Sequence, residues 1–288
     1  MADKIIFNRV AIAGVGLIGG SLALAGKRAG IFGKVIGLGR GKENLATALR
    51  LGVVDEVTSD MAEAVRGADL FFVATPVESI APMILKAAAY LPRGCVITDG
   101  GSVKQSIVRQ VEAELPEGLF FAAGHPVAGT EKTGAQAAFA DLYKDRFTIL
   151  TPTPKTSAQA LEKVRAMWAA AGSKVVIMTP AEHDEAMAVI SHLPHLVAFA
   201  LMDAVAACDP DGKRRAFSAG GLRDTTRIAG SDPVMWRDIF SMNQSLLLQS
   251  LTRFQDSLDG LRMSVESGDF GALQASLERI SRARRELD

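Results

Sequence analysis

Several features that mark specialised classes of protein are scarce or missing in this sequence. Its 288 residues include 2 cysteines, Cys95 and Cys208, which lie too far apart for a disulfide framework or a zinc pattern and indicate a reducing compartment. The 32 basic residues only equal the 32 acidic ones, so the cationic surplus of a nucleic-acid-binding protein is missing. No uninterrupted apolar run reaches the roughly 18 residues of a membrane-spanning helix. We therefore expect a cytoplasmic protein that binds neither nucleic acid nor a membrane.

Residues 1–179 alternate short apolar runs with stretches of helical pattern. The apolar runs are 10–13, 35–38, 70–74, 95–99, 120–123, 147–150 and 174–178. The helical stretches between them are 18–28, 45–51, 79–91, 104–115 and 157–171. Runs that are apolar throughout are typical of strands buried on both faces. The alternation predicts parallel βαβ units with helices on both sides of a sheet.

Residues 180–288 show no convincing strand and predict a second, all-helical domain. A helix is expected over 181–208, interrupted in pattern by Pro194, and another over 236–264. The second helix carries apolar residues at 3/4 spacing, namely Leu247, Leu251, Phe254, Leu258 and Leu261. An apolar stripe of this length has to be shielded from water by another apolar surface. We favour a second copy of the chain, which predicts a homodimer through this domain, over a core formed within one chain.

A glycine-rich segment follows the first apolar run directly and opens the first predicted helix. Residues 14–19 read Gly-Val-Gly-Leu-Ile-Gly. Gly14 permits the tight turn, Gly16 permits close approach of a pyrophosphate, and Gly19 permits close packing of helix on strand. The unpaired N–H groups at the helix start, those of Leu17 and Ile18, then face the phosphates. The alternative is a tight turn without a ligand. We predict an N-terminal Rossmann-type dinucleotide-binding domain of the α/β class.

The end of the second apolar run indicates which dinucleotide is bound. Residues 37–42 contain no carboxylate for a ribose 2′-hydroxyl, whereas Arg40, assisted by Lys42, suits a 2′-phosphate. This favours NADP. The alternative is that Arg40 is a solvated loop residue and that NAD is used as well. Thr75 and Pro76 follow the third run, where the architecture predicts contact with the nicotinamide side of the cofactor.

Two polar segments of the first domain suit catalysis. His125 follows an apolar run within Gly-His-Pro-Val-Ala-Gly, and a neutral imidazole there could accept a proton from a substrate hydroxyl. The alternative is a structural loop histidine. Ser102 lies at the start of the helix predicted over 104–115, where its hydroxyl would suit an N-cap as well as catalysis.

The second domain offers two further polar segments. His192 and His195 stand three residues apart, on one face of a helix; the alternatives are core histidines or a metal site. A third metal ligand of suitable spacing is missing, so we predict no metal. Arg223 and Arg227 would share a face if 221–229 were helical, and either guanidinium could bind a carboxylate. Pairing of an arginine with Asp224 in a structural network is the alternative.

Taken in order, these segments resemble the prephenate/arogenate dehydrogenase family of tyrosine biosynthesis. The matching residues are 14–21, 101–104, 124–131, 191–195, 221–229 and 235–238. The resemblance implies oxidative decarboxylation of prephenate or arogenate, with hydride transfer from carbon 4 to NAD(P). It also implies roles for three residues. His125 takes the proton of the 4-hydroxyl, Ser102 orients His125 or that hydroxyl, and Arg227 positions the ring carboxylate.

The resemblance places the segment from Ser191 to His195 in the substrate pocket. His195 is the better candidate for a substrate contact, followed by His192. The sequence leaves the choice between the keto acid and the amino acid open, with a preference for arogenate or for both. Glu131 and Gln136 are candidates for discriminating between them.

Two other functions compete with this interpretation. One is another NADP-dependent dehydrogenase or an imine reductase of similar two-domain architecture. The other is a non-catalytic, cofactor-sensing protein on the same fold, since fold alone does not determine function. Such a sensor would not need His125, Ser102 and Arg227 together.

Overall fold

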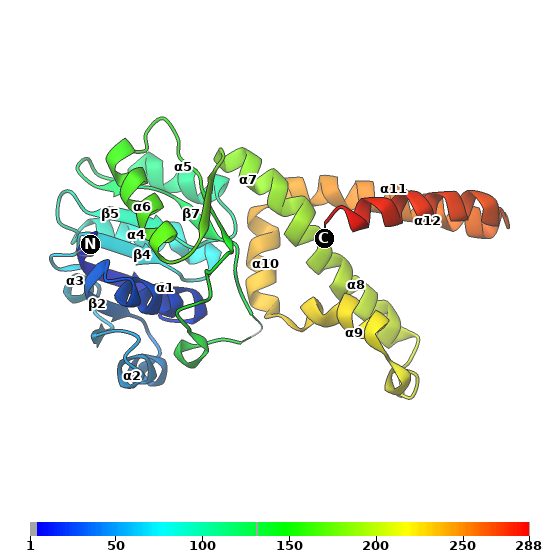
Figure 1. Ribbon diagram of the computed structural model, residues 1–288, viewed down its shortest axis with the longest axis horizontal. Helices are drawn as coiled ribbons and strands as arrows, with labels where there is room; N and C mark the ends of the chain where they lie inside the picture. Colours follow the sequence, from blue (N-terminus) through cyan, green and yellow to red (C-terminus); the bar gives the residue numbers. More distant parts are fainter. Residues whose placement is uncertain (1–4, 131, 288) are drawn as a thin grey trace.

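The computed structural model describes residues 5–130 and 132–287. Its first part, on the left in Figure 1, is built on a parallel sheet. The strand order is β3-β2-β1-β4-β5-β6. The strands are β1 (Phe7–Ala13), β2 (Phe32–Leu38), β3 (Glu56–Thr58), β4 (Leu70–Val73), β5 (Val96–Asp99) and β6 (Phe120–Phe121). The order reverses at β1, which pairs with β2 on one side and β4 on the other. Ligands of such sheets bind at this reversal, beyond the carboxyl ends of the strands.

Helices cover both faces of this sheet. They are α1 (Leu17–Arg28), α2 (Lys42–Arg50), α3 (Met61–Val65), α4 (Val77–Ala88), α5 (Gln105–Glu114) and α6 (Ala158–Ala170). Val10 and Ile12 of β1 belong to the core on one face, while Ala11 and Ala13 belong to the core on the other. The predicted sheet buried on both faces is thus confirmed. The sequence analysis missed β3 and α3, with 3 and 5 residues, which are too short to show a period.

A second, smaller sheet follows, and here the expectation of uniformly parallel strands was wrong. It contains β7 (Gly124–Pro126), β8 (Phe147–Leu150) and β9 (Lys174–Ile177), in that order. β7 runs antiparallel to β8, and β8 parallel to β9. The apolar run 120–123 is a strand only to Phe121 because the chain then turns into β7. β7 is an edge strand, where Pro126 is tolerated because its missing N–H leaves no ladder partner unpaired. His125 therefore lies in a strand.

The second domain begins with the predicted long helix. Thr179 and Glu182 form a capping box at its start. Helix α7 (Pro180–Met187) continues through a π-helical turn (Ala188–His192) into α8 (Leu193–Ala207). The wider turn comes just before Pro194, which has no N–H to donate to the preceding turn.

The remaining helices are α9 (Gly220–Thr226), α10 (Pro233–Met242), α11 (Gln244–Glu266) and α12 (Phe270–Arg285), with 3₁₀ turns at Ala135–Ala137, Arg215–Phe217 and Arg227–Gly230. The single helix expected over 236–264 is divided at Asn243, which has φ −118° and ψ 29°. The division turns the Asn243 amide inward, where it donates to the carbonyl oxygen of Asp184 at 2.9 Å. Trp236 and Ile239 of α10 complete the core over α4, which fastens the second domain to the first.

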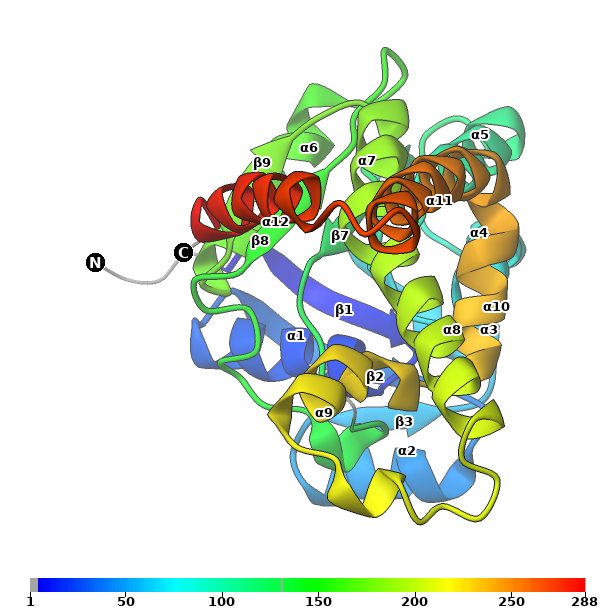
Figure 2. The same cartoon turned by 90° about the vertical axis from the view of Figure 1, so that its right-hand side faces the viewer.

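Helices α11 and α12 lie side by side and extend away from the sheets (Figures 1 and 2). Along the predicted stripe, Leu247 is buried but Leu258 is 53% exposed. The whole chain exposes 15709 Å², whereas a compact monomer of 30.5 kDa exposes about 11,800 Å². By length and apolar composition alone, Pro180–Ala207 could cross a membrane. Its buried His183 and Asp184 instead contact the first domain, and the uncovered apolar faces belong to α8, α11 and α12.

Candidate functional site

The glycine-rich segment forms the turn between β1 and α1. Gly14 has φ 90°, and a Cβ there would lie 2.5 Å from the carbonyl oxygen of Ala74. A Cβ on Gly19 would lie 2.2 Å from the carbonyl oxygen of Gly14, whereas one on Gly16 would meet no atom within 4 Å. Helix α1 begins without a side-chain cap or an acidic residue, so the N–H groups of Leu17 and Ile18 remain for an anion. This turn fits the pyrophosphate of a nicotinamide dinucleotide.

The other predicted cofactor residues lie on the same edge. Arg40 follows β2 by two residues, and its side chain is exposed. Thr75 and Pro76 connect β4 to α4, with the Thr75 nitrogen 3.1 Å from the Cβ position of Gly14. The Ser79 hydroxyl donates to the Thr75 hydroxyl at 2.8 Å and fixes it at the start of α4.

The segments after β5 and at the start of β7 extend this edge toward His125. A Cβ on Gly100 would lie 3.1 Å from Cγ2 of Ile18, at the start of α1. The Gly124 N–H donates to Oδ1 of Asp99 at 3.2 Å, which attaches β7 to the end of β5. His125 therefore stands on the same edge of the sheet as the glycine turn.

His125 is hydrogen-bonded to a histidine that is itself bonded to an aspartate on α7. Nδ1 of His125 lies 2.8 Å from Nε2 of His183, and Nδ1 of His183 lies 2.7 Å from Oδ1 of Asp184. His183 is 0% exposed and His125 8%. Among the described residues, Nε2 of His125 has no hydrogen-bond partner, and this atom is not among the fully buried unpaired atoms. The atom is open for a substrate.

Burial sets the protonation of both rings. It lowers the pKa of His125 well below 6.5, and the neighbouring His183, Lys104 and His192 lower it further. Burial also lowers the pKa of His183, although the hydrogen bond to Asp184 partly opposes this effect. Both imidazoles are neutral at pH 7, the state in which His125 can accept a proton.

A buried ion pair supports the strand that carries His125. The Lys104 ammonium donates to Oδ2 of Asp99 and, at 2.9 Å, to the carbonyl oxygen of Gly124. Both charged side chains are 0% exposed. Oδ2 of Asp99 also accepts from the Gly101 N–H at 2.9 Å. The pair thus ties β5, the loop after it and β7 together beside the imidazole.

Ser102 lies half-buried in the loop between β5 and α5. The prediction that it caps the following helix was wrong, because α5 begins only at Gln105. The carboxylate of Asp184 accepts from the N–H groups of Lys104 at 2.7 Å and Gln105 at 2.9 Å and takes the capping role. A carboxylate also suits the positive end of a helix better than a hydroxyl does. The Ser102 hydroxyl is not used in capping.

The two histidines of the second domain share a face of the helix, as expected, and both contact Trp236. His195 stacks on its indole with ring centroids 3.6 Å apart and bonds through Nδ1 to the carbonyl oxygen of Ser191 at 2.8 Å. His192 is 0% exposed, and its Nδ1 lies 3.1 Å from the amide nitrogen of Asn243. Burial lowers the pKa of His192 to about 4 and lowers that of His195 as well. Both rings are neutral at pH 7.

The two arginines are placed differently from the expected shared helix face. Helix α9 ends at Thr226, so that Arg227 begins a 3₁₀ turn. Arg223 donates through Nε to the carbonyl oxygen of Ser218 at 3.2 Å. The 3₁₀ turn that begins at the exposed Arg227 packs against α8, which carries His195, and after burial the charge of Arg227 also lowers the pKa of His195. A carboxylate bound by Arg227 would therefore lie beside the His195 imidazole.

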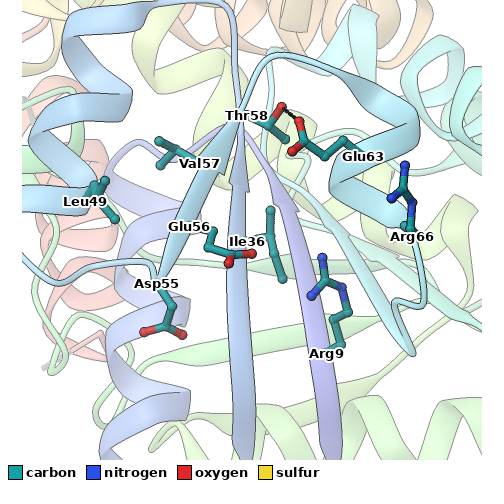
Figure 3. Close-up of a pocket in the computed structure, with 9 residues that line it drawn as sticks. All are labelled: Arg9, Ile36, Leu49, Asp55, Glu56, Val57, Thr58, Glu63 and Arg66. Carbon is teal, nitrogen blue, oxygen red and sulfur yellow. Dashed lines mark hydrogen bonds between the residues drawn. The ribbon is translucent and has the colours of Figure 1, made fainter.

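A separate hollow lies along the edge strand β3 (Figure 3). Its lining includes charges of both signs, and within this lining the Thr58 hydroxyl donates to the Glu63 carboxylate. None of the predicted site residues lines this hollow. It is not the candidate site.

Comparison with known proteins identifies the family. The nucleotide-binding domain of prephenate dehydrogenase matches residues 22–177, and the dimerization domain of prephenate dehydrogenase matches residues 179–279. The prephenate dehydrogenase of Bacillus subtilis is 39% identical over 266 residues, which are 91% of this chain and 71% of that protein. The chain belongs to the prephenate dehydrogenase family. The cyclohexadienyl dehydrogenase of Zymomonas mobilis is 35% identical over 283 residues, 97% of this chain and 96% of that one.

Solved structures of prephenate and arogenate dehydrogenases superpose closely on this chain. Prephenate dehydrogenase from Aquifex aeolicus, in complex with hydroxyphenyl propionate and NAD+, superposes with a TM-score of 0.91 at 36% identity, covering 98% of each chain. Arogenate dehydrogenase from Synechocystis gives 0.81 at 32% identity, covering 97% of this chain and 100% of that one. The predicted resemblance, the Rossmann-type fold followed by helices, and the oxidoreductase class with a nicotinamide dinucleotide cofactor are confirmed.

Sequence analysis missed several residues that the structure brings to the site. The sequence did not predict His183, Asp184, Asn243 or the Asp99–Lys104 pair as partners of the site histidines. The one local signal is the adjacent His183-Asp184 pair in the first turns of α7. Its connection to His125, 58 residues away, depends on the antiparallel placement of β7.

Proposed function

We propose that this chain catalyses the oxidative decarboxylation of prephenate, arogenate or both, with hydride transfer to a nicotinamide dinucleotide. The observation that carries the proposal is a neutral His125 with an open Nε2 on the same edge of the sheet as the glycine turn. An imidazole there takes the proton of the 4-hydroxyl as hydride leaves carbon 4. Loss of carbon dioxide then makes the ring aromatic.

The second domain supplies the substrate contacts in this proposal. Arg227 forms an ion pair with the ring carboxylate, beside His195 on its Trp236 platform. The pair chiefly positions the ring against the nicotinamide, which is proximity catalysis, because too tight a hold on the carboxylate would oppose its departure as carbon dioxide. Ser102 orients the 4-hydroxyl or His125. His192 and Ser191 line the pocket from behind, because His192 is buried and the Ser191 carbonyl holds His195.

The cofactor, when bound, accepts the hydride on its nicotinamide ring. Residues 14–19 hold its pyrophosphate, and Thr75 and Pro76 lie on the nicotinamide side. We propose NADP as the preferred form, because Arg40 is an exposed cation after β2 and residues 37–42 contain no carboxylate. With NAD, Arg40 would remain a solvated side chain.

Arogenate, or both acids, is the proposed substrate. Gln136 and Glu131 are the candidates for recognising the amino acid side chain. Gln136 is exposed in the 3₁₀ turn Ala135–Ala137, which is held to α2 by the hydrogen bond from Ala135 to Asn44 at 2.8 Å. Glu131 lies outside the described residues.

A steady-state assay in four combinations tests the proposal. Prephenate or arogenate is paired with NAD or NADP, and the absorbance of the reduced cofactor is followed. Preference for NADP supports Arg40 as the 2′-phosphate ligand, and equal or better rates with NAD refute that role. Folded protein with no rate in any combination contradicts the function and favours another dehydrogenase, an imine reductase or a cofactor sensor.

We also propose that the chain divides at residues 179/180 and pairs as a homodimer through residues 180–288. The uncovered faces of α8, α11 and α12 and the surface excess of about 3,900 Å² on one chain support this pairing, since an obligate homodimer interface buries about 1,000–2,500 Å² or more on each partner. Sedimentation analysis should give about 61 kDa, twice 30.5 kDa, at micromolar concentration. A monomer would contradict the pairing. The free thiols Cys95 and Cys208 suit the proposed cytoplasmic location.

A further inference from the structure

The contacts of Asp184 determine which nitrogen of His183 carries the proton. Its carboxylate accepts the N–H groups of Lys104 and Gln105 and lies 2.7 Å from Nδ1 of His183. A carboxylate can only accept, so Nδ1 of His183 is the donor. In a neutral His183, Nε2 then has a lone pair.

This lone pair determines the tautomer of His125. The Nε2 atom of His183 faces Nδ1 of His125 at 2.8 Å, and an acceptor there requires a proton on Nδ1 of His125. A neutral His125 with its proton on Nδ1 has its lone pair on Nε2. That is the atom left open at the carboxyl edge.

We propose that His183, held by Asp184, is a positioning residue that fixes His125 as the Nδ1–H tautomer with the Nε2 lone pair toward the substrate. The inference rests on the proposed function for its catalytic meaning. His183 touches neither substrate nor cofactor in this arrangement. Its function is to orient the ring that does.

The proton balance of the step is simple. The O–H bond of the substrate hydroxyl breaks and an N–H bond forms at Nε2 of His125. The imidazolium keeps its Nδ1–H bond to His183, whose own Nδ1–H is held by Asp184. The carboxylate is thus linked to the new positive charge through one neutral ring.

Charged and titratable groups approach His125 from several neighbouring segments. Lys104 from the start of α5 disfavours the imidazolium, and Asp99 from β5 is paired with that lysine. His183 and Asp184 come from α7, and His192 from the π-helical turn. Among the described residues, His183 is the one of these groups that forms a hydrogen bond with the His125 ring, so it is the residue at which to test the tautomer.

Nitrogen-15 spectroscopy of histidine-labelled protein reads the tautomers directly. The chain has 4 histidines, so His125→Asn and His183→Gln assign the two signals by their loss. At pH 7.5, without ligand, we expect Nδ1–H on both rings in the wild type. A proton on Nε2 of His125 would overturn the proposal. Because this readout needs no turnover, it decides the tautomer even if the proposed function fails.

Kinetics of two variants test the consequence for catalysis. His183→Leu removes the acceptor, and we expect kcat to fall about 100-fold with substrate KM within about threefold, since a misplaced general base forfeits about 10²–10⁴. His183→Gln offers an amide oxygen to Nδ1 of His125 and should recover kcat to within about tenfold of the wild type. Glu185→Gln changes an exposed residue of the same helix and is the matched control.

Two results would refute the positioning role. One is a His183→Leu enzyme whose kcat stays within threefold of the wild type. The other is an equal loss of kcat in His183→Leu and His183→Gln when both variants have the same melting temperature. A purely structural role of His183 would produce that result. If His183→Leu does not fold, the comparison of His183→Gln with Glu185→Gln and the tautomer spectrum still decide the question.

Discussion

Removing one charge from the buried Asp99–Lys104 pair should destabilise the protein strongly. Asp99→Asn keeps the size of the side chain and leaves the Lys104 ammonium 0% exposed, with the carbonyl oxygen of Gly124 as its remaining strong acceptor. Breaking a buried pair on one side costs about 3–5 kcal/mol. At about 2 °C per kcal/mol for a chain of this length, the melting temperature should fall by about 6–10 °C.

A surface pair provides the matched control. Lys34 and Glu56 lie 2.5 Å apart but are 46% and 51% exposed, so Glu56→Gln should cost at most about 1 kcal/mol. Urea unfolding at fixed protein concentration compares the two variants. Asp99→Leu combined with Lys104→Met removes both charges and should recover part of the loss. The reasoning is refuted if Asp99→Asn is no less stable than Glu56→Gln.

Three further predictions concern the glycine turn, the cofactor and pH. Gly19→Ala should lower the melting temperature, because its Cβ would lie 2.2 Å from the Gly14 carbonyl oxygen, whereas Gly16→Ala should fold normally and raise the KM of the cofactor. Calorimetry measures the melting temperature of each variant, and cofactor titration measures its affinity for the cofactor. An unfolded Gly16→Ala protein would contradict the open space beside Gly16. Arg40→Ala should raise the KM for NADP by about tenfold or more and change the KM for NAD by no more than about twofold. An equal rise in both KM values would contradict a contact between Arg40 and the 2′-phosphate. The pKa of His192 is about 4 in the folded protein and about 6.5 in the unfolded chain, so between these pH values the unfolded state binds a proton that the folded state does not. The free energy of unfolding should therefore fall by on the order of 3 kcal/mol as the pH drops from 6.5 to 4. His192→Gln should flatten this part of the urea-unfolding profile, and an unchanged slope would show that His192 is not the group responsible.

The parts of the fold and site that the sequence predicted depend on neighbours along the chain. The turn at Gly14, Gly16 and Gly19 needs only its own spacing and the strand before it. The buried strands were visible because both faces of β1 are covered, which makes residues 10–13 apolar throughout. Arg40, Thr75 and Pro76 were assigned from the ends of their strands in the same way, and their cofactor contacts stay predictions.

The parts that the sequence did not predict depend on contacts between distant segments. His125 was expected only after the end of the apolar run 120–123, because β7 has 3 residues and pairs antiparallel with a strand that begins at Phe147. Ser102 was predicted as the cap of the following helix, but the cap is the carboxylate of Asp184, which lies 80 residues beyond Lys104 in the sequence. Neither a long-range cap nor a histidine pair leaves a periodic pattern, so only the folded chain reveals them.

The most direct test of the central claim is the stoichiometry of the reaction. Arogenate or prephenate carrying a labelled ring carboxylate is incubated with the enzyme and NADP, and released carbon dioxide and reduced cofactor are measured together. The account predicts one carbon dioxide per reduced cofactor, with tyrosine or 4-hydroxyphenylpyruvate as the organic product, and loss of both signals by about 10²–10⁴ in His125→Asn. Reduced cofactor without carbon dioxide, or an unimpaired His125→Asn enzyme, would contradict it.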